Sequence, residues 1–172
     1  LSFHDNTGHN APPRLPGCSY PGIIMANHPA SSFSGGDMPA TPHHNAAPDL
    51  GQLTATRAAS DLRQGRYSAE ALVLACQTRI DCFNPELNAL ITLSREGALL
   101  AAREADRRLA QGEPLPPLLG VPVSIKDAFA TRDMRTTSSF RPLADYQPVA
   151  DASVVARWRQ AGAILMGKSN LP

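Results

Sequence analysis

The spacing of apolar and polar positions becomes periodic only after residue 50. Between Leu72 and Phe83, apolar side chains recur every three or four residues, which predicts one buried face of a helix. Ser68 is suited to cap the first turn of this helix, and Asn84-Pro85 is expected to end it. Three further helices are predicted, each followed by a glycine: Ala55 to Gln64, Arg95 to Gln111, and Ala152 to Ala161 with Asp151 as its N-cap.

Three short apolar runs alternate with these helices. Leu87 to Leu93, Val121 to Ile125 and Ala163 to Met166 are each typical of a buried strand. Pro122 is compatible with the second run, because a proline near the first position of a strand removes little of the hydrogen-bond ladder. Helices that alternate with short buried strands predict an α/β fold, in which the two kinds of element form packed layers.

Residues 1–50 differ in composition from the rest of the chain. They hold all five histidines and eight of the sixteen prolines, but only four charged side chains. Such a segment cannot bury enough apolar surface to offset the entropy lost on ordering it. We therefore expect residues 1–50 to be disordered or non-native, with Met38 as a candidate natural start, and residues 51–172 to form the folded part. His43-His44 has no third ligand at a useful spacing, so no metal site is expected there.

The charge balance and the cysteine count exclude several classes of function. The 16 Lys and Arg residues against 15 Asp and Glu give a net charge of +1, which is no electrostatic signature of nucleic-acid or anionic-membrane binding. No run approaches the ~18 apolar residues of a membrane span, and no signal peptide is legible. Cys18, Cys76 and Cys82 are too few and too unevenly spaced for a disulfide framework or a zinc site. We expect a cytoplasmic protein with no cofactor, nucleic-acid partner or membrane partner.

Residues Gly162 to Ser169 match the phosphate-loop pattern G-x-x-x-x-G-K-[ST]. A phosphate loop follows a strand and leads into a helix, so that its backbone amides surround phosphate oxygens. Here a predicted helix precedes the pattern, and the intervening residues are the apolar run Ala163 to Met166. This context indicates a buried strand, so nucleotide binding is not expected.

Lys126 is the candidate for chemistry, because it directly follows the apolar run Val121 to Ile125. Two interpretations remain open from the residues alone. The side chain is either a strand-end lysine that reaches water, or a desolvated lysine that burial keeps neutral, able to accept a proton as a general base. Asp127 would favour the charged form if it faced the same way, but alternation along a strand places it on the opposite face.

Four segments in order resemble the amidase signature family. These are Gly120 to Asp127, Thr136 to Ser139, Asp151 to Val155 and Ala161 to Asn170, and Asn84 to Ala89 fits the same region. The resemblance covers residues 51–172. It implies the amidase signature fold, a mixed sheet sandwiched by helices, of which this chain would be the N-terminal portion.

The resemblance implies hydrolysis of a carboxylic amide by a Ser–cis-Ser–Lys triad, in which Lys126 matches the family lysine and acts as general base. One serine attacks the carbonyl, the second relays its proton to the lysine, and no metal or organic cofactor is implied. Both family serines lie beyond Asn170, so the 172-residue chain is expected to be inactive alone, and its strands are expected to lack their sheet partners. The serines of this chain near the matched segments are not at the matching positions: Ser124, Ser138, Ser139 and Ser169.

Three functions remain open under this resemblance. The first is part of a stand-alone amidase acting on a small-molecule amide, which is favoured because it is the broader part of the family. The second is part of the glutaminase subunit of a tRNA-dependent amidotransferase, which would require partner subunits. The third is a nonenzymatic, truncated remnant. The residues do not identify the amide.

Overall fold

The computed structural model describes residue 50, residues 53–112 and residues 114–171. The segment 1–50, with Met38 and His43-His44, therefore lies outside the described residues except for Leu50. Its division from residues 51–172 stays a prediction. The described residues belong to one compact unit.

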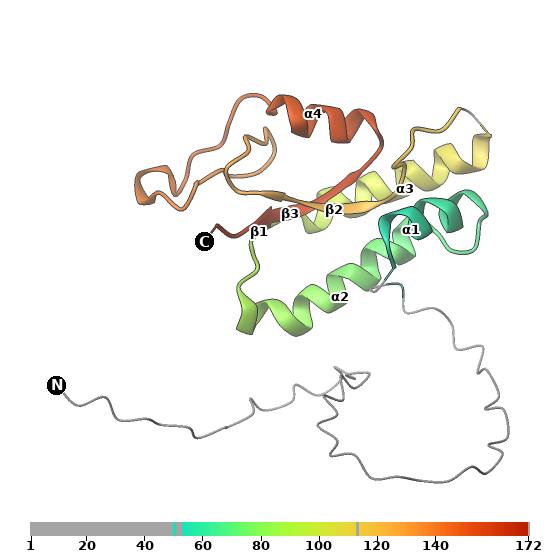
Figure 1. Ribbon diagram of the computed structural model, residues 1–172, viewed down its shortest axis with the longest axis horizontal. Helices are drawn as coiled ribbons and strands as arrows, with labels where there is room; N and C mark the ends of the chain where they lie inside the picture. The colour runs from blue at the N-terminus through green and yellow to red at the C-terminus, as the bar shows by residue number, and fades with distance from the viewer. Residues whose placement is uncertain (1–49, 51–52, 113, 172) are drawn as a thin grey trace, which may run out of the picture. The chain divides into compact units, whose positions relative to one another are not determined.

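Helices and short strands alternate along the described chain, which confirms the predicted α/β class (Figure 1). The helices are α1 (Ala55–Arg63), α2 (Ala69–Leu87), α3 (Arg95–Gln111) and α4 (Ser153–Gln160), with a short 3-10 helix, η2 (Arg141–Leu143). The strands are β1 (Leu90–Leu93), β2 (Pro122–Lys126) and β3 (Ile164–Ser169).

The three strands form one mixed sheet in the order β1-β3-β2. β1 is antiparallel to β3, and β2 is parallel to β3. The expectation that these strands lack partners is therefore wrong in one respect, because they pair with one another around β3. Met166 is an extra residue in β3: Val123 pairs with Leu165, whereas Ser124 pairs with Gly167.

Two hydrophobic clusters lie on opposite faces of this sheet. The larger cluster joins α1, α2 and α3 to the sheet through Val121, Ile164 and Met166. In the smaller cluster, the fully buried Val155 of α4 packs with Ile125 and Leu165. Figure 1 shows α4 on one side of the strands and α1 and α2 on the other. The mixed sheet is sandwiched by helices, as the resemblance implies.

Two side chains cap the first turn of α2. The Ser68 hydroxyl accepts a hydrogen bond from Ala71 N at 3.0 Å, as predicted. Asp106, which lies in α3, accepts hydrogen bonds from the backbone nitrogens of Ala69 at 2.6 Å and Glu70 at 3.0 Å. A carboxylate stabilises the positive end of a helix dipole, so these bonds also attach α2 to α3.

The predicted end of the second helix is wrong by three residues. α2 continues through Asn84-Pro85 to Leu87, and Asn88 N still closes the helix by donating to Asn84 O at 2.8 Å. A proline near the end of a helix removes a single backbone hydrogen bond, which the remaining bonds of that turn compensate. The following strand consequently begins at Leu90.

The predicted cap of the last helix is also wrong. Ala152, not Asp151, occupies the N-cap position of α4, and no side chain bonds there. The Asp151 carboxylate instead accepts a hydrogen bond from Arg132 N at 2.9 Å and pairs with Arg159 Nε at 3.0 Å. Asp151 thus attaches the loop after β2 to α4.

In the part of the chain that the structure describes, no helix is both long and apolar enough to cross a membrane.

Candidate functional site

Lys126 is the last residue of β2, and its side chain is exposed. In the sheet it lies beside Ser169 of β3. The chain turns directly after it: Asp127 N donates to Ser169 O at 3.0 Å, and Phe129 N donates to Lys126 O at 3.0 Å. Within the described residues, the Lys126 ammonium makes no ion pair or side-chain hydrogen bond. The structure thus shows a strand-end lysine open to solvent, and its role as a base stays a prediction.

Asp127, the next residue, is fully buried. Its Oδ2 accepts hydrogen bonds from Thr137 N at 2.9 Å, from Thr137 Oγ1 at 2.5 Å and from Ser138 N at 3.0 Å. Its Oδ1 lies 3.4 Å from Lys168 Nζ. The carboxylate is therefore bound to the loop and to β3, on the face away from Lys126, as alternation predicts.

Lys168, in β3, is the other member of this buried ion pair, and its side chain is also fully buried. The Met166 bulge places Lys168 beside Ile125, on the face of the sheet that α4 covers. Besides Asp127, four oxygens lie within hydrogen-bond distance of its ammonium: Phe129 O at 2.8 Å, Thr131 Oγ1 at 2.9 Å, Thr136 Oγ1 at 2.6 Å and Arg135 O at 3.4 Å.

Two opposing effects act on the pKa of Lys168. Burial lowers this pKa from its usual value of 10.5, because the charged amine has lost its water. The charge of Asp127 and its hydrogen bond oppose the shift, as does the charge of Asp133. Desolvation outweighs the carboxylates, so the net direction is downward.

The structure explains the apparent phosphate-loop pattern. Its last six residues form the strand β3 (Ile164–Ser169), so the expectation of a buried strand in the apolar run Ala163 to Met166 is confirmed. A Cβ atom at Gly167 would collide with the carbonyl oxygen of Thr92 in β1, so the glycine permits close strand pairing. The lysine of the pattern forms the buried ion pair with Asp127.

Sequence reasoning identified one of the two lysines and missed the other. The 16 basic residues include only two lysines, Lys126 and Lys168. Lys168 was hidden because its motif suggested phosphate binding and its neighbours suggested an apolar strand. One signal was present: a lysine that continues a buried apolar run requires a partner, and Asp127 ends the adjacent strand run.

The serines near the matched segments do not complete a triad here. Ser124 is exposed in β2, and Ser169 is half-buried at the end of β3. Ser138 and Ser139 form an exposed turn with φ of 52° at both residues. Such left-handed backbone is uncommon outside glycine, and the hydrogen bonds to Asp127 help to hold it.

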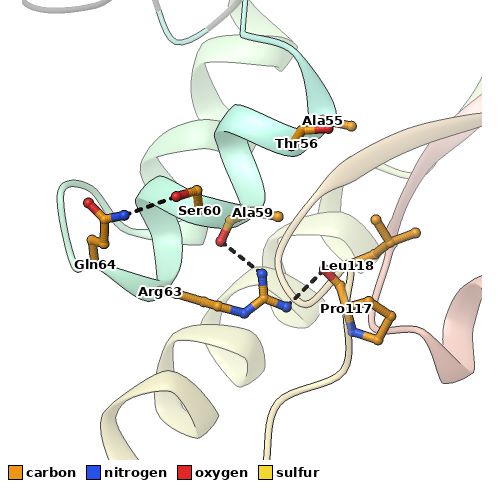
Figure 2. A pocket seen from close by; sticks show the side chains of 8 residues that line it. All are labelled: Ala55, Thr56, Ala59, Ser60, Arg63, Gln64, Pro117 and Leu118. Atoms are coloured by element: carbon orange, nitrogen blue, oxygen red, sulfur yellow. Dashed lines mark hydrogen bonds between the residues drawn. The ribbon is translucent and has the colours of Figure 1, made fainter.

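Figure 2 shows a surface hollow between α1 and the connector that precedes β2. Arg63 crosses it and donates to the carbonyl oxygens of Ala59 at 3.2 Å, Pro116 at 3.0 Å and Pro117 at 2.9 Å. These bonds attach α1 to the connector, and Lys126 is not among the lining residues. Among the described residues, no group of three or more His, Cys, Asp or Glu side chains is placed to hold a metal ion.

The comparison with protein families defines the class. A family model described as Amidase matches residues 71–172, which is more than half of the chain. This match includes all three strands and the segment around Lys126. The chain belongs to the Amidase family, and its mixed sheet and helices are those of an amidase signature fold.

Curated relatives and solved structures agree with this assignment. The chain is 39% identical over 122 residues to the A subunit of glutamyl-tRNA(Gln) amidotransferase from Natranaerobius thermophilus, covering 71% of this chain and 25% of that protein. It is 42% identical over 123 residues to the protein of the same name from Acidothermus cellulolyticus, covering 72% and 24%. A peptide amidase from Stenotrophomonas maltophilia is 32% identical with a TM-score of 0.65, covering 70% of this chain and 25% of that one. The chain thus spans about a quarter of the length of these relatives.

Proposed function

We propose that the complete protein hydrolyses a carboxylic amide of a small molecule, with Lys126 as the general base of a Ser–cis-Ser–Lys triad. The observation that carries the proposal is the position of Lys126, which ends β2 inside the segment that the Amidase family model matches. Its ammonium is exposed and unpaired within the described residues, because Asp127 is bound elsewhere. Without a bound carboxylate, this amine can accept a proton from a serine hydroxyl in its neutral form, which is expected once the rest of the protein shields it from water.

The proton follows a closed path in this mechanism. The first serine adds to the carbonyl carbon and gives its hydroxyl proton to the second serine, which at the same time passes its own proton to the neutral Lys126 amine. Lys126 then returns the proton through the same relay to the leaving nitrogen, and the C–N bond breaks. Water hydrolyses the acyl-enzyme by the same steps. Because the family serines lie beyond Asn170, the 172-residue chain alone is proposed to be inactive.

The test uses the product of the complete reading frame that encodes this chain. Release of ammonia or amine from a panel of small amides gives kcat and KM for the wild type and for Lys126→Ala. Loss of a general base is expected to lower kcat by about 10²- to 10⁴-fold. Arg157→Ala, which removes an exposed cation from α4, is the control and should leave kcat within about twofold of wild type. Full turnover by folded Lys126→Ala contradicts the proposal.

The relatives favour a second candidate, the glutaminase subunit of an amidotransferase. The Natranaerobius and Acidothermus relatives are both named as the A subunit of glutamyl-tRNA(Gln) amidotransferase, and their identity to this chain is higher than that of the peptide amidase. In this case the amide is glutamine, and the ammonia is passed to partner subunits that act on the misacylated tRNA. Glutaminase activity that rises when the partner subunits and glutamyl-tRNA(Gln) are added supports this candidate. Steady turnover of amides by the purified protein alone supports the stand-alone amidase.

Both candidates share a cytoplasmic location as part of the proposal. Cell fractionation tests it, because the protein should follow cytoplasmic marker enzymes. Recovery of the protein with the membrane or periplasmic fraction contradicts this part.

A further inference from the structure

Lys168 contacts both ends of the turn that directly follows Lys126. Its ammonium lies 3.4 Å from Asp127 Oδ1 at the start of this turn and donates to Phe129 O at 2.8 Å at the end. The turn itself is closed by the hydrogen bond from Phe129 N to Lys126 O. One buried charge therefore fixes the backbone at the point where the strand that carries Lys126 ends.

The contacts of this ion pair extend into the loop beyond the turn. The ammonium donates to the hydroxyls of Thr131 and Thr136, while the Asp127 carboxylate binds Thr137 and Ser138. An ammonium has only three N–H donors, so these oxygens supply more acceptors than it needs. Several residues of the loop thus contact the Lys168 ammonium or the Asp127 carboxylate, and these contacts fix the path of the loop after Lys126.

Holding a loop with a buried ion pair carries a large desolvation penalty. Removing two charges from water costs several kcal/mol each, and apolar residues of similar volume stabilise a fold equally well in many proteins. Here the pair lies next to the chain's only other lysine, and one of its members is the residue adjacent to Lys126. Resting on the proposed role of Lys126, we propose that Lys168 is a positioning residue, which together with Asp127 fixes the backbone that aims Lys126 at its proton donor.

The deciding variant is Asp127→Asn/Lys168→Met in the complete enzyme. Lys168→Met alone leaves a buried carboxylate without its cation, and this variant could lose activity by failing to fold. The double variant removes both charges at similar volume and leaves no buried charge unpaired, so it is expected to fold and to be more stable than Lys168→Met. If the pair positions Lys126, kcat per folded molecule falls tenfold or more while KM stays within twofold. A kcat within twofold of wild type in the folded double variant overturns the inference.

Two further variants separate a positioning role from general destabilisation and from failure of the proposed function. Leu62 lies in α1 and belongs to the larger hydrophobic cluster. Leu62→Ala should lower the melting temperature and leave kcat per folded molecule within twofold of wild type. A parallel loss of kcat in Leu62→Ala would show that any destabilisation has the same effect, which also overturns the inference. Lys126→Ala, measured alongside, tests the proposed function itself. If Lys126→Ala is inactive and the double variant has wild-type kcat, only the positioning role fails; if Lys126→Ala is active, the proposed function fails.

Discussion

Lys126 and Asp127 are adjacent in the chain, but one side chain is exposed and the other is fully buried. The Asp127 carboxylate forms an ion pair with Lys168 and accepts hydrogen bonds from Thr137 and Ser138. Asp127 therefore does not form an ion pair with its own neighbour, and the Lys126 amine stays open to a group from elsewhere.

The two lysines should differ in chemical reactivity. Reductive methylation of the folded chain with formaldehyde and a borane reductant is expected to modify Lys126 and to spare Lys168, because Lys168 has no exposed surface. Peptide mass spectrometry measures the two sites separately. In denaturant both lysines should react at similar rates, which is the control. Equal labelling of Lys168 in the folded protein would show that the ion pair is open to solvent.

The buried pair should behave as a coupled unit in stability. Lys168→Met is expected to lower the free energy of unfolding by about 3–5 kcal/mol, because it leaves the Asp127 charge buried without a cation. Asp127→Asn/Lys168→Met should recover most of this loss. Urea denaturation of the wild type, both single variants and the double variant gives the coupling energy. Additive effects of the two substitutions would argue against a direct interaction.

Stability should depend on pH through Lys168. The folded state lowers the pKa of this group below its usual 10.5, so between the two values the unfolded chain binds more protons. The contribution of Lys168 to the free energy of unfolding therefore rises with pH across this window. We expect the stability difference, wild type minus Lys168→Met, to grow as the pH approaches 10.5 and to level off above it. Burial raises the pKa of Cys76 and of Tyr67, but both groups are present in each protein and cancel in the difference. A difference that shrinks with pH contradicts the prediction.

Gly162 should tolerate alanine less well than Gly112, although both have positive φ. At Gly162, with φ of 87°, a Cβ atom would lie 2.7 Å from Leu119 Cα, whereas at Gly112, with φ of 66°, nothing lies within 4 Å. Gly112→Ala is expected to cost about 1 kcal/mol from backbone strain alone. Gly162→Ala should cost about 2–4 kcal/mol, because the clash adds to the strain. Thermal unfolding of the two variants measures the difference, and equal costs would show that the Leu119 backbone moves freely.

Local signals predicted most of the helices and strands. Ser68 caps α2 because its hydroxyl oxygen accepts a hydrogen bond from a first-turn backbone N–H that has no partner within the helix. The helix end predicted at Asn84-Pro85 was wrong, because the position where α2 ends depends on a contact outside the helix. The Asn84 amide bonds to both the backbone N and O of Leu90, so the chain is fixed only after another turn.

Only part of the site could be predicted from the sequence, because the rest depends on contacts between residues far apart in the chain. Lys126 could be singled out because it directly follows an apolar run that is typical of a strand. The family resemblance then implied its role as a base. The ion pair joins Lys168 of β3 to Asp127, the residue that follows β2, 41 positions earlier in the chain. A lysine that continues an apolar run indicates that a partner is needed, but the local sequence does not show which residue it is. The Met166 bulge also reverses the face that simple alternation assigns to Lys168.

The central position of β3 has a consequence for synthesis. β3 is the middle strand of the sheet, yet it comes last of the three in the chain. A growing chain leaves the ribosome N-terminus first, so α2 and α3 can pack as a local pair while β1 and β2 still have no strand beside them. Until residues 164–169 emerge, both strands carry open backbone edges that another nascent chain could occupy. These three strands thus pair only once β3 has emerged, and a pause in translation just before β3 prolongs the exposure of their edges.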